Sequence, residues 1–142
     1  MFLGRFDHNL DAKGRLAIPA KFRAGLADGM VLTRGIDRCL ALYALPDWQA
    51  LTAKVRALPI TDANARAFRR MVFAEAVDLE LDAQGRILVP PELRAYAGLE
   101  RAAVVVGVDA SIEIWGPEHW TEMSARMDQE GVDIAQTLAD VL

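Results

Sequence analysis

The 142-residue sequence contains one cysteine and two histidines, which leaves little for thiol or metal chemistry. Cys39 has no second cysteine for an intrachain disulfide, and we expect it to be a core residue rather than a nucleophile. His8 and His119 lie too far apart in sequence to indicate a metal site. Neither a glycine-rich phosphate loop nor a nucleophile elbow is present. We therefore expect no metal, no cofactor and no catalytic residue, and a protein that is not an enzyme.

Long apolar runs are also absent. No stretch approaches the ~20 apolar residues that cross a bilayer, and residues 1–8 do not form the apolar segment of a secretory signal. The hydrophobic fraction of 53% is nevertheless enough for a core. Since an unpaired cysteine suits a reducing compartment, we expect a cytoplasmic protein without a membrane partner.

The net charge is −4, although nucleic-acid-binding domains are often basic. The charges are unevenly distributed along the chain. Residues 1–25 contain five basic and two acidic residues, whereas residues 116–142 contain one basic and six acidic residues. Because salt screens charges more than about 10 Å apart, a basic face far from an acidic end can still bind phosphate. The net charge therefore neither supports nor excludes DNA binding.

The chain contains an internal repeat. Residues 10–23 read LDAKGRLAIPAKFR and residues 81–94 read LDAQGRILVPPELR, with seven of the 14 aligned positions identical. With one inserted residue the match continues as far as Trp48 and Trp120. This periodicity indicates two copies of one module, separated by a different segment.

Each copy has the pattern of a turn, a short strand, a helical turn and a strand pair. Pro19 ends the first short strand, because proline cannot donate to a β-ladder. The pattern predicts strands at residues 16–18, 30–33, 39–43, 86–89, 103–106 and 111–115, and helical turns at 21–26 and 91–97. Short strands joined by glycine turns favour a small β-barrel over a parallel sheet.

Helices are predicted between and after the copies, at residues 46–57, 62–75, 117–127 and 132–142. Thr61 or Asp62 is expected to cap the second of them. The packing face of that helix is expected to contain four residues at helical spacing: Ala63, Ala67, Met71 and Ala74. Gly131 is expected to separate the last two helices. The fold class is therefore α+β.

Four residues of the repeated turns need no function. Asp11 and Asp82 supply the local backbone hydrogen bonds of a tight turn, and Gly14 and Gly85 supply its positive φ. We therefore interpret them first as turn-forming residues.

Arg15 and Arg86 follow the turns directly, where a hairpin does not require a guanidinium. Arginine binds phosphate, and the O6 and N7 atoms of guanine, through bidentate hydrogen bonds. Lys13 would add a point charge for the DNA backbone. Each arginine could instead pair with a nearby carboxylate, and the residues alone leave both interpretations open.

Two other charged groups are weaker candidates. Asp78, Glu80 and Asp82 alternate along an expected strand, which favours a solvated edge or pairing with arginine over acid–base catalysis. Arg66, Arg69 and Arg70 form a basic helical patch that suits a solvated face or a subunit contact as well as a DNA surface.

Several segments together resemble the MraZ family: residues 1–4, the turn and strand at 11–19, the segment 69–74, the second turn at 82–86, and their tandem arrangement. The resemblance implies a tandem AbrB-like swapped-hairpin β-barrel with flanking helices, in which the two repeats interlock as a pseudo-dimer within one chain. The expected domains are SpoVT/AbrB-like repeats at residues 5–47 and 76–119, a helical linker at 48–75 and a C-terminal helical segment at 120–142.

The resemblance also implies a bacterial transcriptional regulator, usually a repressor, associated with the nucleoid. Such a protein binds double-stranded DNA at short direct repeats upstream of its own division and cell-wall gene cluster, and assembles with itself into rings. Lys13, Gly14 and Arg15 match the family's DNA-binding signature. Arg86 matches it in the second copy, but Gln84 replaces the lysine and retains only the capacity to hydrogen-bond. A ring would multiply the few phosphate contacts of one acidic protomer.

Two alternatives remain at this stage. AbrB-type modules also serve as antitoxins, whose C-terminal segment wraps a toxin partner. A ring-forming scaffold could instead use the basic turns for another acidic ligand.

Overall fold

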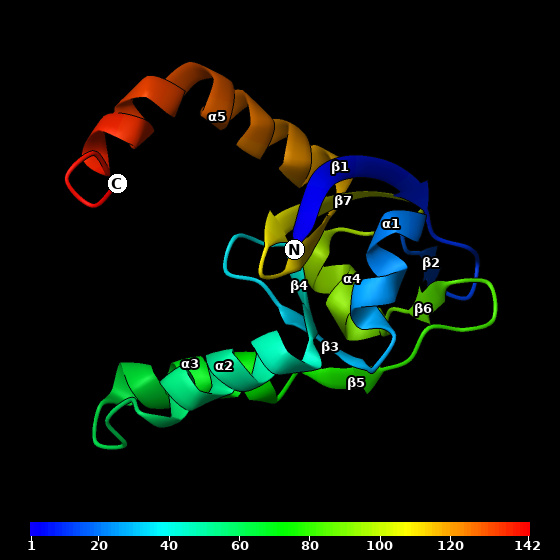
Figure 1. Ribbon diagram of the computed structural model, residues 1–142, viewed down its shortest axis with the longest axis horizontal. Coiled ribbons are helices and arrows are strands. Elements are labelled where there is room, and N and C mark those ends of the chain that lie inside the picture. Colours follow the sequence, from blue (N-terminus) through cyan, green and yellow to red (C-terminus); the bar gives the residue numbers. More distant parts are fainter.

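The computed structural model describes residues 1–142 as a mixed α+β fold (Figure 1). Its elements follow one another in the order β1 (Phe2–Asn9), β2 (Arg15–Ala17), α1 (Ala20–Arg23), a 3₁₀ turn (Ala24–Leu26), β3 (Met30–Arg34), β4 (Leu40–Ala44), α2 (Leu45–Arg56), α3 (Ala63–Phe73), β5 (Val77–Leu79), β6 (Arg86–Leu88), α4 (Pro91–Ala97), β7 (Ala102–Asp109), β8 (Ile112–Trp115) and α5 (Pro117–Thr137). No helix combines the length and the apolar character needed to cross a membrane.

The strands form two antiparallel sheets in which the repeats are paired with each other. The larger sheet has the order β1-β7-β8-β4-β3-β5, and β2 pairs with β6 in a sheet of their own. The ladders β1–β7, β3–β5, β4–β8 and β2–β6 each join one repeat to the other. The larger sheet has β1 and β5 at its edges and does not close on itself, so the barrel that the short strands favour stays a prediction. The prolines that follow β2 and β6 limit this second ladder to three residues a strand.

One hydrophobic core serves both repeats. Three aligned pairs, Leu16 with Ile87, Ile18 with Val89, and Phe22 with Leu93, are all at most 1% exposed within a cluster of 20 buried residues. Alternation along β2 points Leu16 inward and leaves its neighbours partly exposed. The two repeats therefore share one core, and the short β2–β6 ladder is held by the side chains that it buries in this core.

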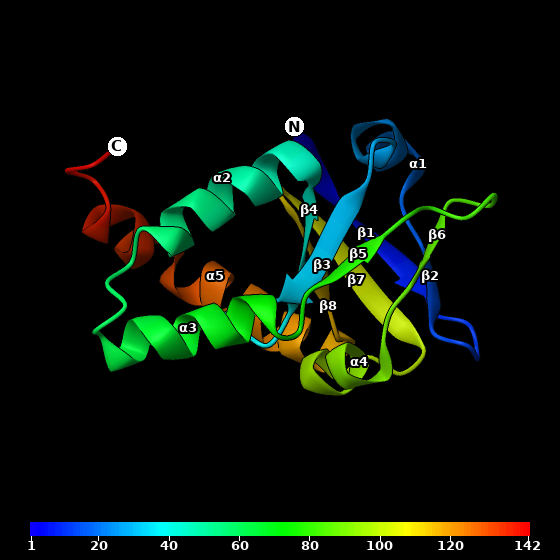
Figure 2. The ribbon, with the colours of Figure 1, turned by 90° about the horizontal axis from the view of Figure 1, so that it is seen from below.

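The helices α2 and α3 extend together from one side of the sheet (Figure 2). Asp62 caps α3, since its carboxylate accepts hydrogen bonds from the backbone N–H groups of Asn64 at 2.8 Å and Ala65 at 3.4 Å. The Thr33 hydroxyl of β3 donates to the carbonyl of Val72 at 2.6 Å and ties α3 to the sheet.

The packing face of α3 differs from the predicted one. Its buried residues are Ala65 and Val72, whereas the four residues predicted to pack are exposed: Ala63, Ala67, Met71 and Ala74. Three of those four are alanines, which remove little apolar area from water when they are buried. The larger Val72 side chain is buried instead, together with Ala65, and α3 ends at Phe73 rather than near residue 75.

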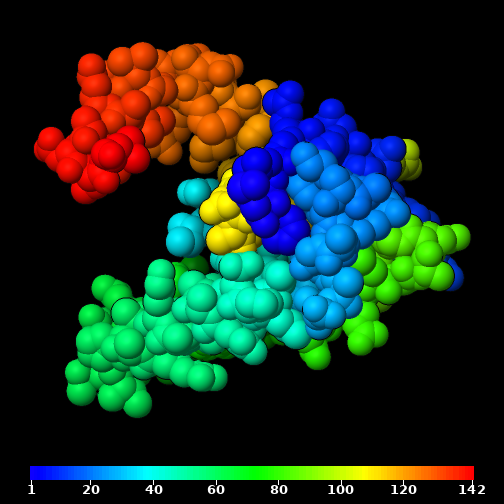
Figure 3. All heavy atoms as spheres, in the orientation of Figure 1, coloured from blue at the N-terminus to red at the C-terminus, as the bar shows by residue number.

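The C-terminal region forms one helix, α5, and not the two helices that the sequence predicts. It continues through Gly131, because one glycine in a helix interior costs only about 1 kcal/mol and no proline follows it. None of its residues is fully buried, and beyond its first turns it projects away from the sheet (Figures 1 and 3).

Candidate nucleic-acid interface

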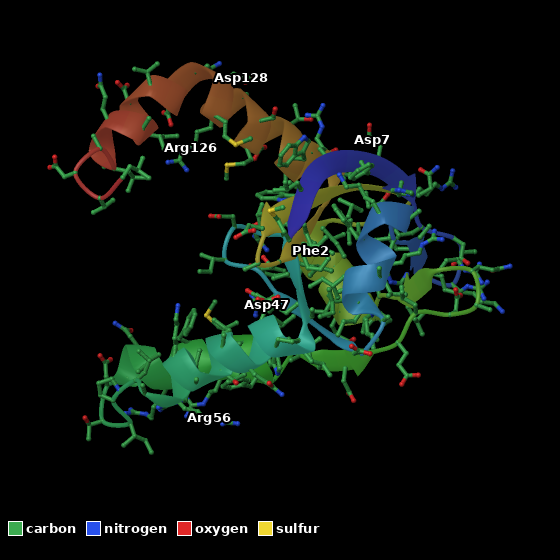
Figure 4. All side chains as sticks on the ribbon, viewed as in Figure 1. Phe2, Asp7, Asp47, Arg56, Arg126 and Asp128 are labelled. Atoms are coloured by element: carbon green, nitrogen blue, oxygen red, sulfur yellow. The ribbon has the colours of Figure 1, made fainter.

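The two repeated turns lie at one end of the molecule, and the tips of α2, α3 and α5 lie at the other (Figures 1 and 2). The turns come close because β2 and β6 pair antiparallel, with Leu16 opposite Ile87. Nitrogen-tipped side chains gather around these loops (Figure 4). Because of this pairing, the two repeated turns, which are 71 residues apart in the sequence, form one surface.

Asp11 organises the first turn. Its Oδ1 accepts hydrogen bonds from the backbone N–H groups of Lys13 at 3.0 Å and Arg15 at 2.9 Å, and its Oδ2 accepts one from Arg15 Nε at 2.6 Å. Gly14 closes the turn at φ +85° and donates its N–H to the Asp11 carbonyl. These bonds, led by the backbone N–H of Arg15, lower the pKa of Asp11 from 3.8 to about 2.

Asp82 repeats this arrangement in the second turn. It accepts from the N–H groups of Gln84 at 2.9 Å and Arg86 at 2.8 Å, and from Arg86 Nε at 2.8 Å. Gly85 has φ +74°. The backbone N–H of Arg86 is the main cause of the lowered pKa of Asp82. The two turns thus have the same internal hydrogen bonds and differ at the position of Lys13 and Gln84, whose side chains are exposed and unpaired.

Arg15 and Arg86 both pair with a carboxylate, which is one of the two interpretations that the sequence left open. The pairing uses Nε, and the two Nη groups of each arginine make no hydrogen bond to the turn's own aspartate. Arg86 Nη1 also lies 3.7 Å from Asp11 Oδ2, a long contact that links the turns. The side chains are 35% and 27% exposed. Each aspartate therefore orients a guanidinium whose outer edge is available to a ligand.

Two further arginines belong to this surface, and sequence reasoning did not single them out. Arg23 Nε donates to the carbonyl of Ile18 at 2.9 Å, and Arg94 Nε donates to that of Val89 at 3.0 Å. They are identical in the two copies and end the aligned segments 10–23 and 81–94. That identity was the available signal, but the sequence gives no reason to connect either arginine with the turn of the other copy.

The other candidate residues lie elsewhere. Arg69 Nη2 donates to the carbonyl of Leu58 at 2.5 Å, and Arg66 Nη1 donates to that of Ile60 at 3.0 Å, so these arginines fix the α2–α3 loop. Cys39 is 1% exposed in a small cluster, and its burial raises the pKa of its thiol to about 12. Neither group contributes to the surface around the turns.

Comparison with known proteins gives the family. A family model described as "MraZ protein, putative antitoxin-like" matches residues 1–71 and again residues 72–141. The chain belongs to the MraZ family. The resemblance drawn from the turns and their tandem arrangement is confirmed.

Relatives in the MraZ family match the chain along its full length. A protein of Thermomicrobium roseum named transcriptional regulator MraZ is 61% identical over 142 residues, which is 100% of both chains. A protein of the same name from Herpetosiphon aurantiacus is 54% identical and covers 96% of this chain and 95% of its own. A third, from Desulforamulus reducens, is 45% identical over 100% of both.

Proposed function

We propose that this protein is a sequence-specific, DNA-binding transcriptional regulator that represses its own division and cell-wall gene cluster. It acts in the cytoplasm, associated with the nucleoid, and binds short direct repeats in the DNA upstream of that cluster. The name shared by its relatives, transcriptional regulator MraZ, supports this assignment.

One observation carries the proposal: two aspartate-anchored arginines lie on adjacent turns of a two-stranded ladder. A two-stranded β-ribbon fits the ~12 Å major groove, where arginine is the commonest specific ligand of guanine. With Nε held by the aspartate, Arg15 and Arg86 can each present both Nη groups to O6 and N7 of one base. Lys13 and Gln84 flank them at the turn tips, where their exposed side chains can reach phosphate oxygens, and Gly14 gives the first turn the positive φ that places Lys13 there.

The protein acts as a ring-shaped homo-oligomer. An acidic protomer with two turns makes few phosphate contacts, and several protomers on successive DNA repeats would multiply them through effective concentration. The outer half of α5 supports self-association, because Met127, Ile134 and Leu138 share a stripe at helical spacing and none is buried. This stripe continues the inner one, where Trp120 and Met123 pack against the sheet.

The ladders that join the two repeats also support the proposal that the fold is a tandem AbrB-like swapped-hairpin barrel. AbrB relatives build their barrel from two chains, and in this chain β1 and β5 each pair with a strand of the other repeat. We assign the DNA-binding, pseudo-dimeric unit to residues 5–47 and 76–119, and assembly to the helical segments 48–75 and 120–142.

Mobility-shift titration tests the proposal. The probe is the DNA directly upstream of the gene, and the control is a scrambled duplex of equal length at the same salt. We expect the unmodified protein to prefer the upstream DNA. Arg15→Ala should reduce that preference by roughly 5- to 150-fold, because a bidentate base contact is worth about 1–3 kcal/mol. Circular dichroism and light scattering should show an unchanged fold and oligomer. Equal operator binding by Arg15→Ala would overturn the role of this arginine.

A second function, an antitoxin-like module that binds a protein toxin, is favoured by the unburied outer half of α5 and by the family description. Co-expression with the product of any neighbouring toxin-like gene, followed by co-purification, distinguishes the two. Removal of the exposed stripe of α5 would then abolish the heteromeric complex rather than the homo-oligomer.

A further inference from the structure

Arg23 and Arg94 each lie over the turn of the other repeat. The guanidinium of Arg94 covers Gly14, such that a Cβ on this glycine would lie 2.8 Å from Arg94 Cζ. The guanidinium of Arg23 lies even closer to a Cβ placed on Gly85. Gly14 and Gly85 are buried although they occupy turns, because these side chains shield them. The turn of one repeat and the arginine of the other therefore form one composite unit.

Backbone hydrogen bonds fix the same exchange. Val89 N donates to the carbonyl of Gly14 at 2.9 Å, and Ile18 N donates to that of Gly85 at 2.9 Å. Val89 and Ile18 are also the residues whose carbonyls hold Arg94 and Arg23. Val89 thus binds both the first turn and Arg94, and Ile18 binds both the second turn and Arg23. These bonds set the position of each guanidinium relative to the turn that it covers.

The charges of the four arginines are not equivalent. Arg15 and Arg86 are each paired with an aspartate, so their charge is locally balanced. Arg23 and Arg94 are held by neutral carbonyls and take part in none of the chain's ion pairs. Their Nη groups make no hydrogen bond within the chain. The uncompensated positive charge beside the turns therefore comes from Arg23 and Arg94, together with Lys13.

We infer that Arg23 and Arg94 are phosphate-binding residues, each serving the turn of the opposite repeat. This inference rests on the proposed DNA-binding function. An arginine with its charge uncompensated and its Nε fixed offers phosphate a preorganised pair of N–H groups. The aspartate-paired Arg15 and Arg86 read bases, and the carbonyl-held pair positions the turns on the DNA backbone.

The two composite units are unequal in charge. The first combines Lys13 with Arg94, whereas the second has Gln84 at the lysine position and depends on Arg23 alone. Loss of Arg23 should therefore remove the only uncompensated charge of the second unit.

A purely structural role, shielding of the glycine, makes a different prediction. Methionine keeps an unbranched apolar stem over the glycine and removes the charge, so Arg94→Met and Arg23→Met separate shielding from phosphate binding. Arg94→Lys keeps the charge without the planar fork. Arg56→Met is the matched control, because Arg56 is exposed on α2, away from the turns (Figure 4).

Fluorescence anisotropy over a salt series, with the upstream and scrambled duplexes, tests the inference on the full-length protein. We expect Arg94→Met and Arg23→Met to weaken binding to both duplexes by the same factor. Each should reduce the slope of log K against log salt by about one for every DNA-bound protomer. Arg94→Lys should keep the slope, and Arg15→Ala should lose the preference for upstream DNA instead.

Complementation gives a second, independent readout. Gln84→Lys should steepen the salt slope by about the same amount and, combined with Arg23→Met, restore it. This result would place Arg23 at the second turn even if Arg94→Met failed to fold. If the Met variants keep the slope of Arg56→Met while Arg15→Ala loses its preference, the inference is overturned and the proposed function stands. If the unmodified protein prefers neither duplex, the proposed function itself fails.

Discussion

Asp11 holds the first turn together through both carboxylate oxygens, and its ionisation therefore controls where Arg15 lies. Its pKa falls from 3.8 to about 2 in the folded chain. Between about pH 4 and pH 2 the unfolded chain thus binds more protons than the folded one at this residue. The stabilisation by Asp11 is complete above this window and is lost as the pH falls through it.

The variant Asp11→Asn should be less stable than the unmodified protein at neutral pH, because the amide cannot form the ion pair with Arg15. The difference should shrink as the pH falls from about 4 to about 2, since protonation of Asp11 removes the same interaction. Melting temperatures across this range measure it. Asp128→Asn is the control, because Asp128 is exposed on α5 and outside the chain's ion pairs (Figure 4). A difference that stays constant over the window would contradict the assignment.

Among the elements, α5 is the one that the sequence predicts as two helices and that forms a single helix. Gly131 has no neighbour within 4 Å of a Cβ placed on it, so an added methyl group would meet no steric opposition. Glycine also loses more backbone entropy on folding than alanine does. Gly131 therefore destabilises the middle of α5 and can be replaced by alanine without a clash.

Gly131→Ala should stabilise α5 by about 0.5–1 kcal/mol without a change elsewhere. Hydrogen exchange of the amides around residues 128–137 should slow by roughly two- to fivefold, which is that free energy expressed as a ratio. Exchange in β2 and β6 should be unaffected. Faster exchange near Gly131 in the variant would indicate that the helix is bent there for a reason outside the chain.

Local chemistry explains how far the sequence alone could predict the molecule. Asp11, Gly14 and Pro19 act within a few residues of themselves, so the turns and the short strands after them were predictable. The exchange of strands between repeats depends on pairs such as Leu32 with Val77 and Leu16 with Ile87, which lie far apart in the sequence, and no local pattern encodes it. Arg94 was missed for the same reason, because its partner glycine belongs to the other copy.

For the whole molecule, the separation of the basic turns from the outer half of α5 allows assembly and DNA binding to be tested independently. Replacing Ile134 and Leu138 together by glutamate puts charge on the exposed stripe that we assign to self-association. Val132→Glu is the matched control, since Val132 is 72% exposed on another face of the same helix. Light scattering should show protomers for the double variant and the native oligomer for the control.

The DNA affinity of the double variant should then depend on the number of binding sites in the probe. On a duplex with a single repeat it should bind as tightly as the unmodified protein, because Arg15 and its turn are untouched. On a duplex with several repeats it should bind about 10²-fold more weakly, since linked sites gain their affinity through effective concentration. Equal losses on both probes would mean that α5 acts on the turns themselves, and no loss on either would mean that one protomer suffices for operator binding.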